Sequence, residues 1–300
     1  MTRRSIVLLL VVLVAAALAA GAAALLLGGD DDSPAAKSLP AESPAPVDSK
    51  RPATVWAVGD GADGGPEAKQ VADLINRAKP DRFLYLGDVY DDGTPEEFNT
   101  NYHPAYGSFD KIAAPTPGNH DWPEHDAGYD PYWRKANPQI PQNRHYYRFR
   151  VGGWQVLSLN SESGLEAGSP QMRWLKVQVR KPGTCRIAFW HRPFLNAGKH
   201  GDQEDVGSLW RTVRGRAALV VNGHDHNMQQ FKPKDGIVEL ISGAGGHDPY
   251  DVNGGDPRLV WSRDNTPGAL RLDLRPGVAR FRFVSPDKGT LQRGTVHCRR

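Results

Sequence analysis

The sequence predicts an α/β fold with a mixed or two-sheet core, and three observations support this prediction. Short apolar runs that suit buried strands alternate with amphipathic helical segments from Thr54 to Val221. The helical period disappears after Gly236, where the pattern indicates further strands. No interior linker rich in Pro, Gly or Ser interrupts this part of the chain. We therefore expect residues 53–300 to form one domain.

Residues 1–28 are predicted to form an N-terminal signal-anchor or transmembrane segment. Arg3 and Arg4 precede an unbroken apolar run from Ile6 to Leu27, and about 20 such residues are enough to cross a bilayer. Positive charge before the run and aspartates after it place the N-terminus in the cytoplasm. A cleaved signal peptide is the alternative, because the run contains small residues that suit a peptidase. The rest of the chain is thus expected to be extracytoplasmic, either anchored in the membrane or secreted.

Composition constrains the remaining organisation. Residues 29–52 are rich in Pro, Ala and Ser without an apolar period, which predicts a disordered linker. The net charge of +3 is too slight to indicate a nucleic acid as partner. Cys185 and Cys298 are the only cysteines. Outside the cytoplasm we expect a disulfide between them, with two free buried thiols as the alternative.

The folded part opens with a strand, a helix and a second strand. The apolar runs 54–58 and 82–86 each end in a glycine followed by an aspartate, Asp60 and Asp88. Between them, residues 67–79 repeat apolar side chains with a helical period. Strands joined in this way are parallel. We expect both aspartates at the carboxyl ends of neighbouring strands, where open α/β sheets place their sites.

Later elements repeat this arrangement. A helix over 94–99 is expected to begin with Thr94 as cap, and a loop stiffened by prolines then supplies Asn119, His120 and Asp121. Residues 122–143 show no period and are predicted to be a long surface loop near the site. Further predicted elements are a hairpin at 145–151 and 154–160, helices from 169 and over 206–213, strands at 185–190 and 217–221, and antiparallel strands at 237–242, 268–274, 278–284 and 294–297.

Polar side chains at five strand ends form the candidate site. His191 follows the strand 185–190, and His224 and His226 follow the strand 217–221. Side chains two positions apart in extended chain point the same way, so these last two can reach one ion. Carboxylate, amide and imidazole donors suit Fe, Mn or Zn. The ligands are too many for one ion, which predicts two ions about 3.5 to 4 Å apart.

These motifs resemble those of the calcineurin-like metallophosphoesterases, and most closely their purple-acid-phosphatase-like branch. The resemblance rests on five ordered motifs between residues 54 and 247: Gly59-Asp60, Gly87-Asp88, Gly118-Asn119-His120-Asp121, His191 and Gly223-His224-x-His226. It implies a four-layer αββα sandwich of two mixed sheets flanked by helices, with a dinuclear metal centre. The implied metals are iron paired with iron, zinc or manganese.

The resemblance also implies a role for each motif residue. Asp60 and His226 would bind the first metal, and Asn119, His191 and His224 the second, while Asp88 would bridge the two. His120 would contact the phosphoryl group or protonate the leaving oxygen, with Asp121 orienting its ring. His200 resembles a substrate-facing histidine that some members carry, and the glycine-rich loop 243–247 would bring His247 toward the site.

Two departures from the family pattern concern the first metal. Ala62 stands where the general superfamily has a histidine ligand. The purple acid phosphatases use a tyrosine three residues after the second aspartate instead, whereas here Tyr90 comes two residues after Asp88. A one-residue slip in the turn still allows the Tyr90 phenol to reach the metal, so Tyr90 is a further candidate ligand.

The expected function is an exported phosphatase that hydrolyses small phosphate monoesters by attack of a metal-bound hydroxide. One alternative is a phosphodiesterase acting on nucleotides or lipid head groups. Another, of a different class, is a catalytically silent binding domain at the cell surface. The remaining histidines outside the motifs, among them His125 and His145, are expected to be ordinary loop or surface residues.

Overall fold

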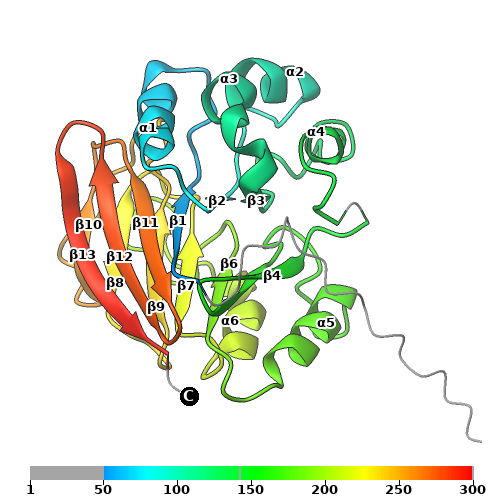
Figure 1. Cartoon of the computed structure of the whole chain (residues 1–300), viewed down its shortest axis with the longest axis vertical. Coiled ribbons are helices and arrows are strands. Elements are labelled where there is room, and N and C mark those ends of the chain that lie inside the picture. Colours follow the sequence, from blue (N-terminus) through cyan, green and yellow to red (C-terminus); the bar gives the residue numbers. More distant parts are fainter. Residues whose placement is uncertain (1–50, 142, 299–300) are drawn as a thin grey trace, which may run out of the picture. The chain divides into compact units, whose positions relative to one another are not determined.

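The computed structural model describes residues 51–141 and 143–298, all within a unit that spans residues 41–300. Two β-sheets pack face to face with helices on both outer sides, which confirms the expected four-layer sandwich (Figure 1). The helices are α1 (Pro66–Arg77), α2 (Pro95–Glu97), α3 (His103–Tyr106), α4 (Tyr129–Ala136), α5 (Pro170–Val179) and α6 (Gly207–Val213). Short π- and 3₁₀-helical turns cover Phe98–Tyr102, Gly107–Ile112 and Glu204–Val206.

The first sheet has six strands in the order β13-β12-β11-β1-β2-β3. Its central strands β1, β2 and β3 run parallel, as the connections through helices require. The C-terminal strands add to β1 in antiparallel fashion. The strand bounds are β1 (Ala53–Val58), β2 (Arg82–Tyr85), β3 (Ala113–Pro115), β11 (Ala269–Arg275), β12 (Val278–Ser285) and β13 (Gly289–His297).

The second sheet has seven strands in the order β10-β8-β9-β7-β6-β5-β4. Strands β5, β6, β7 and β9 are parallel, and β4 forms the predicted hairpin with β5 across Gly152 and Gly153. The strand bounds are β4 (Tyr147–Val151), β5 (Trp154–Ser158), β6 (Arg186–Phe189), β7 (Leu219–Asn222), β8 (Met228–Phe231), β9 (Val238–Ser242) and β10 (Leu259–Arg263).

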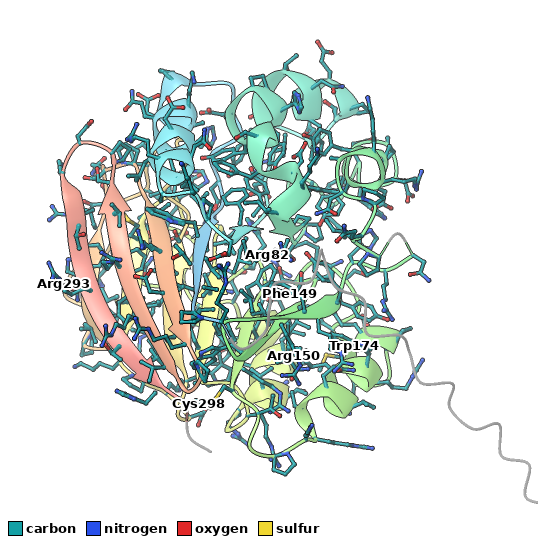
Figure 2. The ribbon with its side chains drawn as sticks, in the orientation of Figure 1. Arg82, Phe149, Arg150, Trp174, Arg293 and Cys298 are labelled. Atoms are coloured by element: carbon teal, nitrogen blue, oxygen red, sulfur yellow. A yellow bond between two sulfur atoms is a disulfide. The ribbon has the colours of Figure 1, made fainter. Side chains whose placement is uncertain are left out.

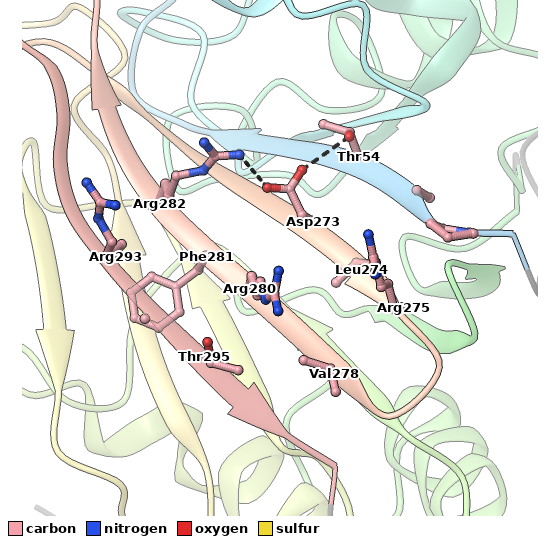
Figure 3. Close-up of a pocket in the computed structure, with 13 residues that line it drawn as sticks. Thr54, Asp273, Leu274, Arg275, Val278, Arg280, Phe281, Arg282, Arg293 and Thr295 are labelled. Atoms are coloured by element: carbon pink, nitrogen blue, oxygen red, sulfur yellow. Dashed lines mark hydrogen bonds and ion pairs between the residues drawn. The ribbon is translucent and has the colours of Figure 1, made fainter.

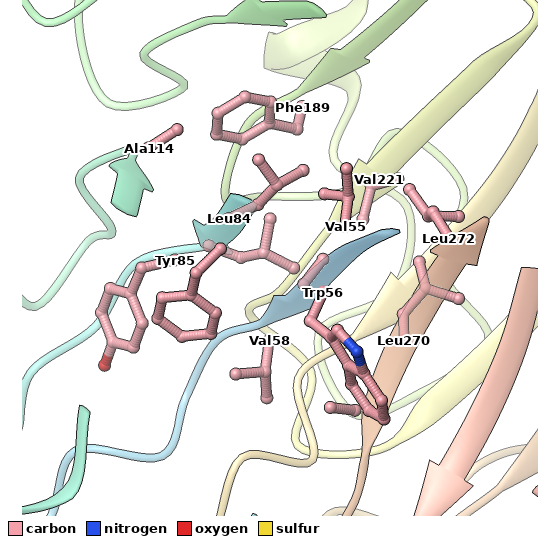
Figure 4. Close-up of a cluster of buried hydrophobic side chains, with 14 of the residues drawn as sticks. Val55, Trp56, Val58, Leu84, Tyr85, Ala114, Phe189, Val221, Leu270 and Leu272 are labelled. Carbon is pink, nitrogen blue, oxygen red and sulfur yellow. The ribbon is translucent and has the colours of Figure 1, made fainter. Parts of the chain in front are cut away.

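The core between the sheets explains why the central strands are apolar throughout. Val55, Leu84, Phe189, Val221 and Leu272 come from five strands of both sheets and are each at most 2% exposed (Figure 4). The alternate residues on β6 and β7, Ala188 and Val220, pack with α5 and α6 on the other face of the sheet and are buried as well. Full burial of such a side chain contributes about 1.5–3 kcal/mol. This packing fixes the carboxyl ends of β1, β2, β6 and β7 relative to one another.

Two features of the secondary structure differ from the expectations. Residues 122–143 are not all loop, because α4 forms there with Tyr129 and Trp133 buried one helical turn apart. Strands β8 and β10 were not foreseen; in β8 the polar Gln229 is fully buried, which hides the usual alternation of polar and apolar residues. Strand β9 pairs antiparallel with β8, as expected, and parallel with β7 on its other side.

The predicted disulfide between Cys185 and Cys298 is present, with their Cα atoms 5.4 Å apart. Cys185 directly precedes β6 and Cys298 directly follows β13, so the bond joins the two sheets. Figure 2 shows Cys298 at the C-terminal end of the described chain. The crosslink therefore fastens the end of the polypeptide to the opposite layer of the sandwich.

None of the helices in residues 51–141 and 143–298 is both long and apolar enough to cross a membrane. The predicted anchor at 1–28 and residues 29–50 of the predicted linker lie outside the described residues. Membrane attachment and the linker thus stay predictions.

Candidate metal centre

The turns that follow β1, β2 and β7 each place one polar residue in the left-handed backbone region. Asp60, Asp88 and His224 have φ values of 60°, 68° and 72°. This conformation is uncommon for residues other than glycine and, in an ordered turn, often marks a functional site. The sharp reversals turn all three side chains into one volume at the strand ends.

The glycines beside these residues are required by close approach. A Cβ atom on Gly223 would lie 2.5 Å from the Asp60 carboxylate, and one on Gly118 would collide with the Asp88 carboxylate. Each glycine thus leaves room for a carboxylate that arrives from a different strand. This explains physically why the polar residues of the motifs are accompanied by glycine.

The first group of candidate ligands converges on the Tyr90 phenol. Its oxygen lies 2.8 Å from Nε2 of His226, 3.2 Å from Oδ2 of Asp88 and 3.3 Å from Oδ1 of Asp60. Nε2 of His226 lies 4.0 Å from Oδ1 of Asp60. The slipped position of Tyr90 therefore does place the phenol among the candidate ligands of the first metal.

The second group meets on the other side of Asp88. Nε2 of His191 lies 3.0 Å from Oδ1 of Asn119, 3.2 Å from Oδ2 of Asp88 and 3.2 Å from Nδ1 of His224. The ligand atoms of Asp88, His191 and His224 all lie within 4.8 Å of one another. Oδ2 of Asp88 thus faces both groups, the position that a bridging ligand requires.

Hydrogen bonds to backbone carbonyls orient two of the imidazoles for metal binding. Nδ1 of His191 lies 2.8 Å from the Leu86 carbonyl, and Nδ1 of His226 lies 2.6 Å from the Asp248 carbonyl. A carbonyl can only accept, so each Nδ1 carries the proton and Nε2 is the nitrogen that can bind a cation. Such outer contacts are typical of histidines that bind metals.

The electrostatics of the site also suit cations. Burial raises the pKa of Asp60 well above its ordinary value, and the neighbouring Asp88 raises it further. Burial works against the Asp88 carboxylate as well, but the charge of His191 holds its pKa below the usual range. Burial lowers the pKa of His224 to about 2 and that of His226 to about 4. Burial opposes a charge on His191, but the Asp88 carboxylate raises its pKa to about 10, so without metal this imidazole supplies the positive charge that a bound cation would replace.

The electrostatic environment of Tyr90 also suits a bound cation. Burial, followed by the charges of Asp88 and Asp60, raises the pKa of its phenol well above the ordinary value. The phenol therefore stays protonated unless a cation balances the carboxylates. The oxygen, nitrogen and phenol donors fit two ions of the Fe, Zn or Mn class.

His120 lies at the edge of this centre. Asp121 was expected to orient the His120 ring, and this expectation was wrong. The backbone N–H of His120 donates to Oδ1 of Asp88 at 3.0 Å, and ring atom Nδ1 meets the Asp91 carbonyl. The buried Asp121 carboxylate instead accepts from the backbone N–H groups of Asp88 and Gly118, at 2.9 and 2.8 Å. Asp121 therefore shapes the two loops that carry the ligands, and a carbonyl orients His120.

His200 lies beside the second group of ligands. Its ring centroid is 4.2 Å from that of His224, and its Nδ1 lies 2.6 Å from Oδ1 of Asp225. Asp225 is fully buried between the two ligand histidines in sequence. The sequence pattern alone does not reveal this carboxylate, because its side chain lies opposite to those of the two adjacent histidines.

His247 is brought to the site by the glycine-rich loop, as expected. The backbone N–H of His247 donates to the Asp60 carbonyl at 3.1 Å, and its ring stacks on Tyr90 with centroids 3.9 Å apart. Its Nδ1 lies 3.1 Å from Oδ2 of Asp63. Tyr250 stacks in turn on His226 at 3.8 Å. Asp63 and Tyr250 are site neighbours that the sequence pattern did not reveal.

A cavity of about 330 Å³ opens beside His226. Its walls include the acidic side chains of Asp63, Glu67 and Asp248, together with His247, and no Lys or Arg lines it. The cavity therefore offers a negatively charged environment next to the candidate ligands.

A larger groove of about 720 Å³ lies elsewhere, on the outer face of β11, β12 and β13 (Figure 3). Arginines dominate its walls, and Asp273 pairs there with Arg282 at 2.5 Å. The groove reaches Thr54 at the start of β1, whereas Asp60 follows the other end of this strand. It contains none of the candidate metal ligands.

Comparison with known proteins points to one family. A model of the calcineurin-like phosphoesterase family matches residues 53–228. A probable purple acid phosphatase 20 of Arabidopsis thaliana is 25% identical over 214 residues, which are 60% of this chain and 48% of that protein. The chain thus spans about half the length of this curated relative.

Solved structures share the fold at low sequence identity. GAP50, described as the anchor in the inner membrane complex of Plasmodium, matches with a TM-score of 0.68 and 16% identity over 84% of this chain and 90% of that one. Purple acid phosphatase PPD1 of yellow lupin matches with a TM-score of 0.65 and 14% identity, over 83% and 54%. A dimetal phosphatase of Danio rerio matches with a TM-score of 0.56 and 12% identity, over 83% and 100%.

Proposed function

The chain belongs to the calcineurin-like phosphoesterase family of metal-dependent phosphatases, and from that premise we propose that it hydrolyses phosphate monoesters outside the cytoplasm. The observation that carries this proposal is the contact of Asp88 with both groups of candidate ligands, through Tyr90 on one side and His191 on the other. Two ions held there would activate a water molecule and neutralise the oxygens of the phosphoryl group.

The protein's own residues would position the substrate and move the proton. His120 donates through Nδ1 to the Asp91 carbonyl, which leaves Nε2 to contact a phosphoryl oxygen or to protonate the leaving oxygen. The Asp225 carboxylate holds His200 through Nδ1, which leaves Nε2 to contact an anionic substrate. The two histidines thus provide one contact on each side of the site.

The acidic cavity supports a finer proposal about the leaving group. Because three carboxylates, those of Asp63, Glu67 and Asp248, line it and outnumber Lys288, which donates to Thr266 in its wall at 3.2 Å, a leaving group with further negative charge would be repelled. We propose that the enzyme prefers phosphate monoesters of neutral or amine-bearing alcohols. An amine would be attracted by carboxylates at contact distance.

The leaving-group preference is testable with a charge-neutralising variant. Glu67→Gln should raise KM for an amino-alcohol phosphate several-fold while leaving KM for a neutral alkyl phosphate unchanged. Glu166→Gln, which changes an exposed acid outside this cavity, is the matched control. Equal KM values for both substrates in wild type and Glu67→Gln would refute the proposed preference.

Two alternative functions remain to be separated from this one. A phosphodiesterase acting on nucleotides or lipid head groups would need room for a second ester group, and the acidic walls disfavour nucleotides. A silent surface domain is suggested by the likeness in fold to GAP50, which is described as an anchor. Against that role, each candidate ligand side chain is present and packed into one site.

One assay distinguishes the three functions. The full-length chain, after its metal content has been measured, is offered a chromogenic monoester and the matching diester. Faster turnover of the monoester supports a phosphatase, whereas faster turnover of the diester supports the phosphodiesterase. No turnover of either ester with both metals bound would support the silent domain.

We also propose that the chain is exported and held at the membrane by residues 1–28, or secreted if these are removed. The apolar run 6–27 and the disulfide are both in keeping with this location. Protease added to intact cells should degrade the anchored domain. Protection from protease in intact cells, followed by degradation after lysis, would contradict export.

A further inference from the structure

A second cluster of potential metal ligands lies in the segment between β3 and β4. It consists of His125, Asp130 and His145, and shares no residue with the dinuclear centre. One ligand atom of each residue lies within 4.8 Å of those of the other two. The side chains are 23%, 17% and 19% exposed, so the cluster is partly buried but within reach of ions in solution.

The two imidazoles are held against Trp122. The His125 ring stacks on the indole with centroids 4.0 Å apart and an interplanar angle of 7°, and the His145 ring meets it edge-on at 5.0 Å. Nδ1 of His125 lies 2.6 Å from the Trp122 carbonyl. That carbonyl can only accept, so Nε2 of His125 carries the lone pair, as in histidines that bind a metal.

The third member is positioned by α4. Asp130 lies in the first turn of this helix, and its Oδ1 is 2.7 Å from Nε2 of His145. A carboxylate oxygen and two imidazole nitrogens thus converge from three different parts of the segment. Such a donor set suits Zn²⁺, which accepts three protein ligands and a water molecule in tetrahedral geometry.

We propose that His125, Asp130 and His145 form a zinc site separate from the dinuclear centre. Zinc–ligand distances of about 2.0–2.2 Å require only that the three side chains close around the ion. A water molecule would take the fourth position. The backbone N–H of Trp122 donates to the Gly118 carbonyl at 3.0 Å. Because Trp122 also directly follows Asp121, this zinc would fasten the loop that carries Asn119 and His120.

The competing interpretation is a pair of ion pairs without metal. His145 would then pair with Asp130, whose Oδ1 lies 2.7 Å from Nε2 of His145, and His125 with the exposed Asp126, whose Oδ1 lies 3.4 Å from Nε2 of His125. Zinc needs the neutral imidazoles, whereas the ion pairs need the charged ones. Direct measurement of bound zinc therefore separates the two.

The experiment counts zinc by mass spectrometry in the full-length chain after loading with Zn²⁺ and removal of free ions. Asp130→Asn and His145→Ala should each contain one zinc fewer than wild type. His103→Ala, which removes an exposed histidine outside the cluster, should lose none. Asp130→Asn preserves the side-chain volume, so it decides the question even if His145→Ala fails to fold.

A second readout makes the result independent of phosphatase activity. Co²⁺ bound at the cluster should quench the fluorescence of Trp122, and this saturable phase should be absent in Asp130→Asn and retained in Asp88→Asn. Equal zinc content in wild type and Asp130→Asn, or the same Co²⁺ quenching in both, would overturn the proposal. Neither outcome would affect the proposed phosphatase function.

Discussion

The phenolic oxygen of Tyr90 lies 2.8 Å from Nε2 of His226, between the carboxylates of Asp60 and Asp88. Tyr90 comes two residues after Asp88, whereas the family pattern places the tyrosine three residues after it. Its phenol still reaches the ligand cluster because the turn after β2 reverses sharply at Asp88. Tyrosinate bound to ferric iron gives a visible charge-transfer band, so this position has a direct spectroscopic consequence.

Tyr90→Phe is expected to abolish that band in the iron-loaded protein. It should also lower the affinity for the first metal by at least about 10- to 100-fold, because removing a group that only supports a ligand already has an effect of this size. Tyr250→Phe is the matched control, because it keeps a ring stacked on His226. Absorption spectra and metal titrations check both variants. An unchanged band in Tyr90→Phe would exclude the phenol as a ligand.

Asp225→Asn should lower kcat/KM by up to about 100-fold, the lower end of what a positioned proton-transfer group contributes. The amide of Asn holds the His200 ring less firmly than the carboxylate does, so kcat should fall while KM changes little. Asp225 is a positioning residue and metal content should stay constant. Glu204→Gln, which changes an exposed acid four residues after His200, should show neither effect. An unchanged kcat in Asp225→Asn would contradict the role.

Burial raises the pKa of Glu239 to about 8, although the N–H groups of Phe194 and Leu195 donate to it. The folded state therefore binds this proton more tightly than the unfolded chain, where glutamate has a pKa of about 4.3. The contribution of this proton to the free energy of unfolding is fully present below about pH 4.3 and decreases as the pH rises to about 8. Above that pH it no longer changes.

Glu239→Gln removes this titration. Wild type should therefore lose stability relative to the variant as the pH rises from 5 to 8. The difference between their free energies of unfolding should change by an amount on the order of a few kcal/mol at most. Denaturant unfolding at several pH values measures the difference, with Glu166→Gln as an exposed control. A constant difference across this range would show that Glu239 does not titrate there.

The disulfide closes a loop with a sequence separation of 113 residues between the two sheets. Its removal in the Cys185→Ala, Cys298→Ala double variant should lower the free energy of unfolding by about 2–5 kcal/mol, mainly by freeing the unfolded chain. Thermal unfolding with and without reductant provides the same comparison in wild type. Two titratable thiols in the denatured, unreduced protein would contradict the crosslink.

The arrangement of the candidate ligands could be predicted because parallel strands deliver their carboxyl ends to one edge. Asp60, Asp88, His191, His224 and His226 each follow such a strand. The role of Asp121 could not be predicted in the same way. The family resemblance implied that Asp121 orients the His120 ring, but neighbouring side chains in extended chain point in opposite directions, and Asp121 instead accepts from backbone N–H groups.

Contacts formed by irregular segments were also beyond the sequence pattern. Helix α4 buries only Tyr129 and Trp133 among charged and proline residues, too few for a recognisable period. His125 and His145 meet because the chain returns along this helix. Asp225 was hidden because the two adjacent histidines explained the motif without it. Such contacts depend on tertiary packing, which a single sequence does not encode in any local period.

The central claim is that one carboxylate, Asp88, is shared by two metal ions. The most direct test is the metal content of the full-length Asp88→Asn protein at the two positions, counted by mass spectrometry beside wild type and Asp73→Asn, an exposed control. We predict that Asp88→Asn loses both ions and its phosphatase activity together. Retention of either ion at wild-type affinity would contradict a shared bridge.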